Sequence, residues 1–152
     1  MKVVRANRCF MAEVNMYSPT HIMQRDFTVE EKAVISFLLR AAGKDESYIS
    51  KFFLETQCCD MTDGRMGSIQ FVHLGLNPSS DARKFGGEMS SCHFTDDDGV
   101  LVSVVLYADT SGIPFELDVW KVDFSPLIRI PNDISKFVLD ASRRQEGAKA
   151  DD

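Results

Sequence analysis

The sequence lacks the short motifs by which many enzymes and cofactor-binding proteins are identified. It contains no glycine-rich phosphate loop, no C-x-x-C cysteine pair and no local nucleophile motif. The ligands of structural zinc sites usually lie about two to four residues apart in each half of the site. A site built from Cys58, Cys59, Cys92 and His93 would break that spacing, so we expect no metal and no cofactor.

Long hydrophobic runs are also missing. No apolar stretch approaches the roughly 20 residues that a membrane-spanning helix requires. Polar residues, among them Arg5, Arg8 and Glu13, interrupt the N-terminal segment, where a secretion signal would need an apolar core. We therefore expect a cytoplasmic protein with no membrane partner.

Basic residues are in the minority. The chain has 17 Lys and Arg against 23 Asp and Glu, which gives a net charge of -6. Binding to a phosphate backbone needs clustered cations, so nucleic acid is not an expected partner. The acidic excess is concentrated in residues 91–123, where Lys121 is the single base. Such a stretch is either a set of solvated turns, in which Asp is a preferred residue, or an acidic surface for a basic protein or a cation.

The apolar content is sufficient for one hydrophobic core. The 152 residues are 44% hydrophobic and 26% charged, as is ordinary for a globular chain. Residues 1–26 show no sustained periodicity and are expected to be an N-terminal extension. Residues 27–144 are expected to form a single α+β domain, and residues 145–152 a flexible charged tail.

Three strand-like segments within residues 87–131 form the centre of the predicted fold. Turn sequences at residues 96–99 and 109–112 separate them, which predicts an antiparallel meander. The middle segment, residues 100–107, is almost wholly apolar and is therefore expected inside the sheet. The sequence predicts an antiparallel sheet of about four strands, at residues 68–76, 87–95, 100–108 and 113–122.

Two helices are predicted before the sheet and one after it. The first begins at the capping box of Thr28 and carries an apolar stripe through residues 29–42. Asp45 is expected to cap a second helix at residues 46–56, and a last helix is expected at residues 134–144. The predicted fold class is therefore α+β.

The strand predicted at residues 113–122 alternates between apolar and polar side chains. A four-residue turn before it would place Ser103 opposite Asp118 and Leu101 opposite Trp120. The candidate binding face of the sheet then consists of Ser103, Glu116, Asp118 and Trp120.

Three further residues are secondary candidates. They are Asp60, Asp63 and His93. A four-residue turn at residues 96–99 would pair His93 with Val102 and direct it to the apolar face, and this is the register that we expect. A three-residue turn with a glycine bulge would instead place His93 opposite Ser103, where it could meet a carboxylate in an acid–base pair.

Three stretches of the chain together resemble a known family. They are FTVEEKAVISFLL at the first helix, DGRMGSI before the first strand and FELDVWKVDFSPL at the end of the meander. Over about residues 27–131 the chain is similar to an uncharacterised family of small bacterial cytoplasmic domains of unknown function. The resemblance implies a bacterial origin and supplies no catalytic residues.

Two classes of function fit these observations. The first is a small acidic, non-enzymatic interaction or regulatory module that binds a protein partner, for example to neutralise a toxin. Trp is a common anchor in such interfaces. The second is a small hydrolase or metal-dependent enzyme that uses carboxylates of the meander face. We expect the first, and association into a homo-oligomer is a further alternative.

Overall fold

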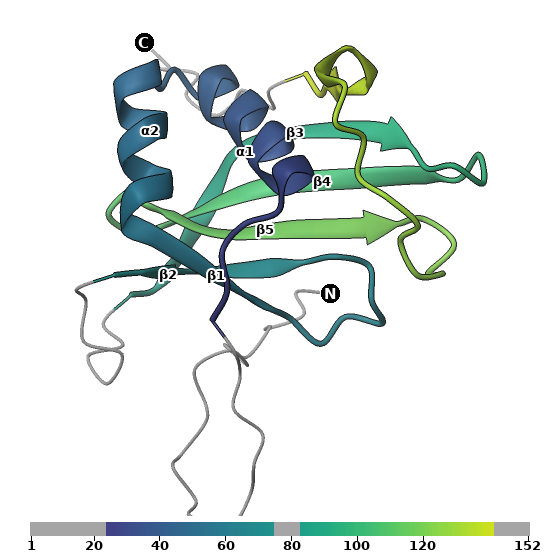
Figure 1. Ribbon diagram of the computed structural model, residues 1–152, viewed down its shortest axis with the longest axis horizontal. Coiled ribbons are helices and arrows are strands. Elements are labelled where there is room, and N and C mark those ends of the chain that lie inside the picture. Colours follow the sequence, from purple (N-terminus) through teal and green to yellow (C-terminus); the bar gives the residue numbers. More distant parts are fainter. Residues whose placement is uncertain (1–23, 75–82, 142–152) are drawn as a thin grey trace, which may run out of the picture.

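The computed structural model describes residues 24–74 and 83–141. In these ranges the chain forms two α-helices, one 3-10 helix and a single antiparallel sheet of six strands (Figure 1). The strand order across the sheet is β1-β2-β5-β4-β3-β6. The elements are α1 (Val29–Ala41), α2 (Glu46–Glu55), β1 (Thr56–Asp60), β2 (Ile69–His73), β3 (Phe85–Thr95), β4 (Leu101–Asp109), β5 (Pro114–Lys121), η1 (Ile134–Lys136) and β6 (Val138–Leu139).

The α+β class and the antiparallel sheet are as predicted, but the sheet has six strands rather than about four. One unpredicted strand is β1, whose sequence TQCCD lacks a run of β-branched and aromatic residues. It forms because all of its residues pair with β2, while Arg25 and Cys58 exchange backbone hydrogen bonds of 2.8 and 2.9 Å at its other edge. Tertiary pairing here outweighs a weak local signal.

The predicted helix at residues 134–144 is wrong. Where the structure describes this range, it forms only the 3-10 turn η1 and then the edge strand β6, which pairs with residues 92–93 of β3. Phe137, between the two, is buried, and its ring lies 5.6 Å from that of Phe37 and 5.9 Å from that of Phe94. Since an isolated short helix is marginally stable, burial of Phe137 and pairing with β3 favour the extended backbone.

Several predictions concern residues outside those that the structure describes. They are most of the N-terminal extension (residues 1–23), the end of the first predicted strand (75–76), the end of the last predicted helix (142–144) and the charged tail (145–152).

Both α-helices begin where the sequence predicts. Thr28 Oγ1 accepts a hydrogen bond from Glu31 N (3.1 Å), and the Glu31 carboxylate accepts one from Thr28 N (2.9 Å), so the capping box is confirmed. Asp45 caps α2 by accepting from Tyr48 N at 2.8 Å. The Arg25 guanidinium donates to both oxygens of Glu31, at 2.7 and 2.9 Å, and thereby ties the start of α1 to the bridge at β1.

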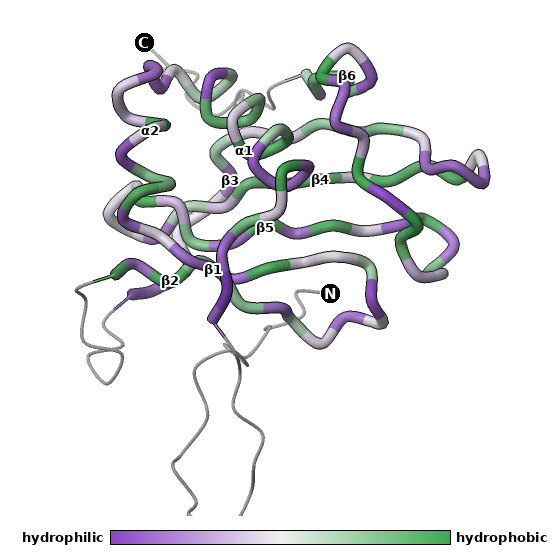
Figure 2. The backbone as a smooth tube through the Cα atoms, viewed as in Figure 1, coloured by the Kyte–Doolittle hydropathy of each residue, from purple (hydrophilic) through white to green (hydrophobic). Residues whose placement is uncertain are grey.

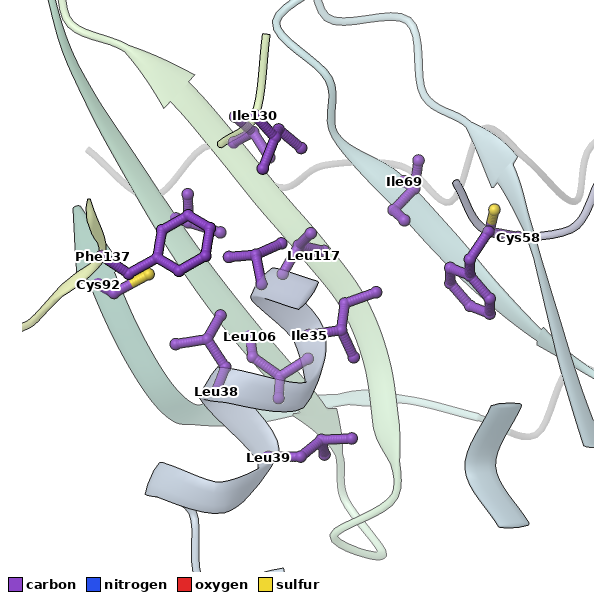
Figure 3. Packing of buried hydrophobic residues seen from close by; sticks show 14 of the residues in the cluster. Ile35, Leu38, Leu39, Cys58, Ile69, Cys92, Leu106, Leu117, Ile130 and Phe137 are labelled. Carbon is purple, nitrogen blue, oxygen red and sulfur yellow. The ribbon is translucent and has the colours of Figure 1, made fainter. Parts of the chain in front are cut away.

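The hydrophobic core lies between α1 and one face of the sheet. Ile35, Leu38 and Leu39 project from α1 toward Leu106 of β4 and Leu117 of β5 (Figure 3). All five side chains are fully buried. Apolar residues recur along β4 and on α1 in the hydropathy view (Figure 2), and β4 lies inside the sheet, as its apolar sequence predicts. No helix within the described ranges is long and apolar enough to cross a membrane.

The two turns of the meander are shorter than expected. Asp96 N donates to Val100 O (2.9 Å) and Asp109 N to Ile113 O (2.8 Å), so each turn contains three residues rather than four. The last residue of each turn is a glycine with φ of +80°. Glycine adopts this conformation at little cost, and the closing glycine therefore sets the turn length. The registers expected on both sides of β4 are wrong.

Candidate functional site

The observed register places the four candidate residues on the sheet face that points away from α1, which we call the outer face. Across β4 and β5, Ser103 lies opposite Trp120, and Asp118 lies opposite Val105. Glu116 lies opposite Tyr107 on the same face. The pairing differs from the expected one by two residues. Because side chains alternate with a period of two, each of them keeps its predicted face.

The four candidates differ in their surroundings. Glu116 is buried, and Ser103 and Asp118 are half-buried. Asp118 Oδ1 accepts a hydrogen bond from Ser68 Oγ at 3.2 Å, and Ser68 Oγ accepts one from the backbone of β5 at 2.9 Å. Trp120, by contrast, is 42% exposed. Of these four residues, Trp120 is the one that presents a large surface to a partner.

Trp120 belongs to an exposed apolar cluster at the end of β5. Its ring centroid lies 5.9 Å from that of Phe124, with an angle of 59° between the planes. Leu101 and Val122 lie on the same face, and Val122 N donates to Leu101 O at 3.0 Å. All four side chains are exposed, Phe124 most of all at 71%. We call Leu101, Trp120, Val122 and Phe124 the Trp120 patch.

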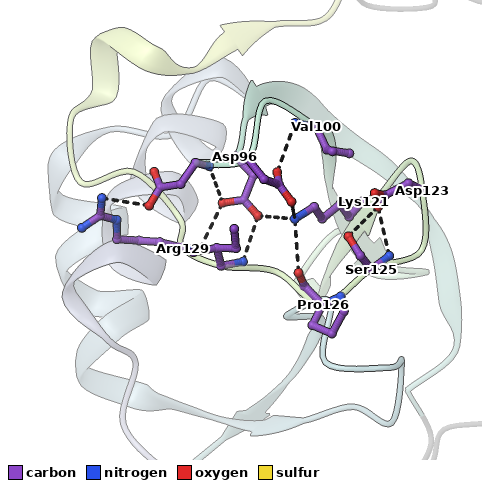
Figure 4. Close-up of polar contacts among 10 residues, drawn as sticks. Asp96, Val100, Lys121, Asp123, Ser125, Pro126 and Arg129 are labelled. Carbon is purple, nitrogen blue, oxygen red and sulfur yellow. Dashed lines mark hydrogen bonds and ion pairs between the residues drawn. The ribbon is translucent and has the colours of Figure 1, made fainter.

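The backbone at Phe124 is strained. Its φ is +62°, and its N–H donates to Lys121 O at 2.9 Å to close a tight turn. Asp123 supports this turn by accepting hydrogen bonds from Ser125 N (3.0 Å) and Ser125 Oγ (2.6 Å) (Figure 4). A bulky residue in the left-handed region costs about 1–2 kcal/mol. The ring gains little burial to offset that cost, because most of it faces solvent.

The loop between β1 and β2 lies beside this turn. Leu127 N donates to Arg65 O at 3.0 Å, so the loop and the segment after β5 are joined. Arg65 has a φ of +62°, and within the described ranges it and Phe124 are the only non-glycine residues with positive φ. Asp63 fixes the loop by accepting from Met66 N (3.1 Å) and Ser68 N (2.8 Å). The two strained residues thus lie on segments that are hydrogen-bonded to each other at one end of the sheet.

This loop also lines a cleft of about 500 Å³. The secondary candidates Asp60 and Asp63 are both in its wall. Asp60 is paired with Arg25 at 2.7 Å, and the Asp63 carboxylate accepts the two loop N–H groups described above. Both carboxylates therefore have structural partners within their own chain.

A buried ion cluster anchors the end of β5 from the opposite face. Lys121 is fully buried, and its Nζ donates to Asp96 Oδ2 (2.8 Å), Asp98 Oδ2 (2.6 Å) and Pro126 O (3.2 Å) (Figure 4). Burial by itself lowers the pKa of Lys121, but Asp96 and Asp98 outweigh that effect and raise it. The lysine thus stays charged and fixes the strand from which Trp120 projects to the other face.

Asp96 holds the chain that follows the Phe124 turn. Besides Lys121, it accepts hydrogen bonds from Ile128 N (2.8 Å) and Arg129 N (3.2 Å). Burial raises the pKa of Asp96, but the hydrogen bonds from Ile128 and Lys121 outweigh burial and hold the pKa below its usual value. The neighbouring Asp97 pairs with Arg129 at 3.0 Å. Asp96 is buried and is therefore not the solvated turn residue that the first interpretation of the acidic stretch expects; its carboxylate instead anchors the segment after β5.

His93 lies opposite Ser103, in the register that we did not expect. Its Nδ1 is 2.7 Å from Asp140 Oδ1, next to the edge strand β6. Asp118 lies two strands away, about 10 Å across the sheet. Ser103, His93 and Asp140 are of the residue types that perform acyl transfer, but Ser103 lies within a strand paired on both sides. The backbone N–H groups of such a strand are engaged in the sheet and do not form an oxyanion hole.

Three residues of interest are missed by the sequence analysis: Arg65, Phe124 and Asp140. The order Asp-Phe-Ser-Pro after a strand indicates a turn, because Asp bonds to its local backbone and Pro stops the sheet. It does not indicate that Phe124 takes the left-handed position. Arg65 likewise stands where glycine would be expected, and Asp140 falls in the segment predicted as helix.

Comparison with known proteins assigns no activity to this site. A protein-family model matches residues 24–131, and its description is "Domain of unknown function (DUF6984)". The matched range contains both the DGRMGSI and the FELDVWKVDFSPL stretches, which the structure packs against each other through Arg65 and Leu127. The resemblance to an uncharacterised family is confirmed. Comparisons with curated proteins and with solved structures give no match.

Proposed function

The chain belongs to the family described as "Domain of unknown function (DUF6984)", and we propose from the geometry that it is a small, non-enzymatic protein-interaction module. The description of the family names no activity, so the proposal rests on the structure alone. The contact surface is the Trp120 patch. Trp, Tyr and Arg are the residues most often found at the energetic centres of protein interfaces. Trp120 on β5 and Arg65 on the adjoining loop are of these types.

The observation that carries the proposal is Phe124, an aromatic residue that is 71% exposed in a left-handed backbone conformation. The isolated fold would be served as well by glycine or asparagine, which adopt this conformation at lower cost. Residues with a strained backbone cluster at binding and catalytic sites. At Phe124, burial of the side chain does not offset the cost of the strain. The aromatic ring of Phe124 supports Trp120 at the surface, and this gives the strain a role in binding.

The alternative of a hydrolase or metal-dependent enzyme has less support. Within the described ranges, no group of three or more His, Cys, Asp or Glu side chains is placed to hold a metal ion. Asp60 and Asp63 have the structural partners described above, and the His93–Asp140 pair faces a strand without an oxyanion hole. No specific observation favours a second function.

Site-specific photo-crosslinking tests the proposal. The photoreactive residue p-benzoylphenylalanine is placed at position 124, and in a matched control at position 54, where Leu54 is 80% exposed on α2. We expect a discrete protein adduct from position 124 and none from position 54, and we expect Trp120→Ala to abolish the adduct while leaving the circular dichroism spectrum unchanged. No adduct from position 124, or the same adducts from both positions, would contradict the proposal.

A further inference from the structure

One part of the outer face is buried, although it is the face that points away from α1. Cys59, Gln70 and Glu116 lie side by side there on β1, β2 and β5, and we call them the Glu116 row. They are 0%, 3% and 5% exposed, whereas Trp120 on the same face is 42% exposed. An antiparallel sheet with helices on one face commonly leaves its other face in water, and Gln and Glu are rarely fully buried. Their burial indicates that another segment of the chain covers the Glu116 row.

Within the described ranges, the segments that cross the sheet lie on the other face. α1 packs against β4 and β5 there (Figure 3), and the ring of Phe52 on α2 lies 5.3 Å from that of Phe71 on β2. Phe71 directly follows Gln70, so the two side chains point to opposite faces. The segment after β5 returns to the inner face as well, where Ile130 joins the core. We therefore look for the cover in the parts of the chain outside the described ranges.

Three segments lie outside those ranges, and residues 1–23 suit the Glu116 row best. They contain three Lys or Arg and one Glu, together with many apolar residues. Residues 75–82 contain no Lys or Arg. In residues 142–152 three basic residues balance three acidic ones, and no apolar side chain is larger than that of alanine. A buried carboxylate such as that of Glu116 is stable only where cations or hydrogen-bond donors meet it, which favours the basic segment.

The place at which residues 1–23 join the described chain also fits. Arg25 and Cys58 exchange two backbone hydrogen bonds, so the chain enters along the free edge of β1, next to Cys59. Glu116 is two strand spacings from Cys59, which is about 10 Å. Residues 1–23 can extend over about 75 Å. The segment is therefore long enough to cross the whole row.

A disulfide provides an anchor for this segment. Cys59 is disulfide-bonded, whereas Cys58 and Cys92 are free. The chain has four cysteines, and the fourth is Cys9 in the N-terminal segment. A bond between Cys9 and Cys59 would hold the middle of residues 1–23 against one end of the Glu116 row.

We infer that residues 1–23 dock on the outer face of β1, β2 and β5, cover the Glu116 row and are joined to it by a disulfide between Cys9 and Cys59. When the disulfide forms, the two thiols lose two protons and two electrons to a disulfide oxidant such as oxidised glutathione, which leaves as two thiols. Arg5 and Arg8, on either side of this anchor, bring positive charge to Glu116. The Trp120 patch stays outside the cover, so the inference does not depend on the proposed function of that patch.

Peptide mapping of the full chain tests the anchor. The chain is treated with oxidised glutathione, the remaining thiols are blocked, and the protein is digested without reductant and analysed by mass spectrometry. We expect a linked pair of peptides that joins Cys9 to Cys59. The adjacent Cys58 supplies the matched control, because Cys58→Ala should keep this linkage and Cys59→Ala should lose it. The absence of the linkage, a linkage of Cys9 to Cys58, or one that joins two copies of the chain would overturn the inference.

Alkylation of the reduced chain tests docking without the disulfide. The rate at which N-ethylmaleimide modifies Cys59 is measured in the Cys58→Ala background. One variant carries Arg5→Glu and Arg8→Glu. The control carries Arg143→Glu and Arg144→Glu, which change the net charge by the same amount. We expect the first variant to react at least about tenfold faster than the background, because like charges then meet at the sheet, and the control to stay within about twofold.

Cys92 serves as the internal reference in this measurement. It is buried in the core on the inner face, so its rate of alkylation reports unfolding of the whole domain and should not change. Equal rates at Cys59 in the two double variants would overturn the inference. If Cys92 also reacts faster, the charge changes have disturbed the fold, and the peptide map of the unsubstituted chain decides.

Discussion

Position 124 should be more stable with glycine than with alanine. At a φ of +62° the left-handed backbone conformation costs an alanine about 1–2 kcal/mol, and glycine does not have this cost. Glycine loses about 0.5–1 kcal/mol more conformational freedom on folding. Both variants lose the same ring contact with Trp120, so that loss cancels in the comparison. We therefore expect Phe124→Gly to be more stable than Phe124→Ala by about 0.5–1 kcal/mol.

The matched control is Leu54, which is 80% exposed within α2. In a helix the order is reversed, and Leu54→Gly should be less stable than Leu54→Ala by about 1 kcal/mol. Urea denaturation followed by circular dichroism gives all four free energies of unfolding. If alanine were as stable as glycine at position 124, Phe124 would not be strained, and the observation on which the proposed function rests would be lost. A Phe124→Gly protein that folds normally should also lose binding to the partner identified by cross-linking, measured without the photoreactive residue, and this separates binding from stability.

The remaining predictions concern the anchor beneath the patch and the core. Asp96→Ala should cost about 3–5 kcal/mol, because it leaves Lys121 buried with one carboxylate, whereas Asp97→Ala should cost well under about 1 kcal/mol, since its pair with Arg129 is exposed. Chemical denaturation ranks these two neighbours, and equal losses would mean that the cluster is misassigned. Val104→Ala should cost about 2–4 kcal/mol through the cavity that it leaves in the core, measured in the same way. Because the pKa of Asp96 is lowered in the folded state, its contribution is present above about pH 4 and is lost as the pH falls through the folded pKa; acid titration of Asp96→Ala should therefore show a weaker loss of stability below pH 4 than wild type.

Features that depend on local contacts could be predicted from the sequence. The capping box at Thr28 and the cap at Asp45 each involve residues three apart, and both are present. The apolar run of β4 predicts a strand inside the sheet, and the strand order confirms that place, although Leu101 is exposed and the other outer-face residues of β4 are only partly buried. The lengths of the two turns could not be predicted from the sequence. A four-residue turn and a three-residue turn that ends in glycine are both compatible with the same residues.

Features that depend on residues distant in the sequence could not be predicted. β1 and β6 have little strand signal of their own, and each forms by pairing with a strand already in place. The face of Trp120 was predictable because an error of two residues in register does not change the face of a side chain. The conformation of Phe124 was not predictable, because its turn closes on the backbone of Lys121, whose side chain is bound by residues 96 and 98, more than 20 positions earlier in the chain.

Trp120 is the single tryptophan of the chain, so its fluorescence tests the central claim directly. The measurement is the quenching of this fluorescence by acrylamide, first with the dilute chain alone and then with the partner found by cross-linking from position 124, or with a concentrated chain if the adduct is a dimer. The exposed ring should be quenched readily in the free chain, and binding should reduce the quenching constant because the partner covers the ring. A partner that binds and leaves the quenching of Trp120 unchanged would show that the contact surface lies elsewhere.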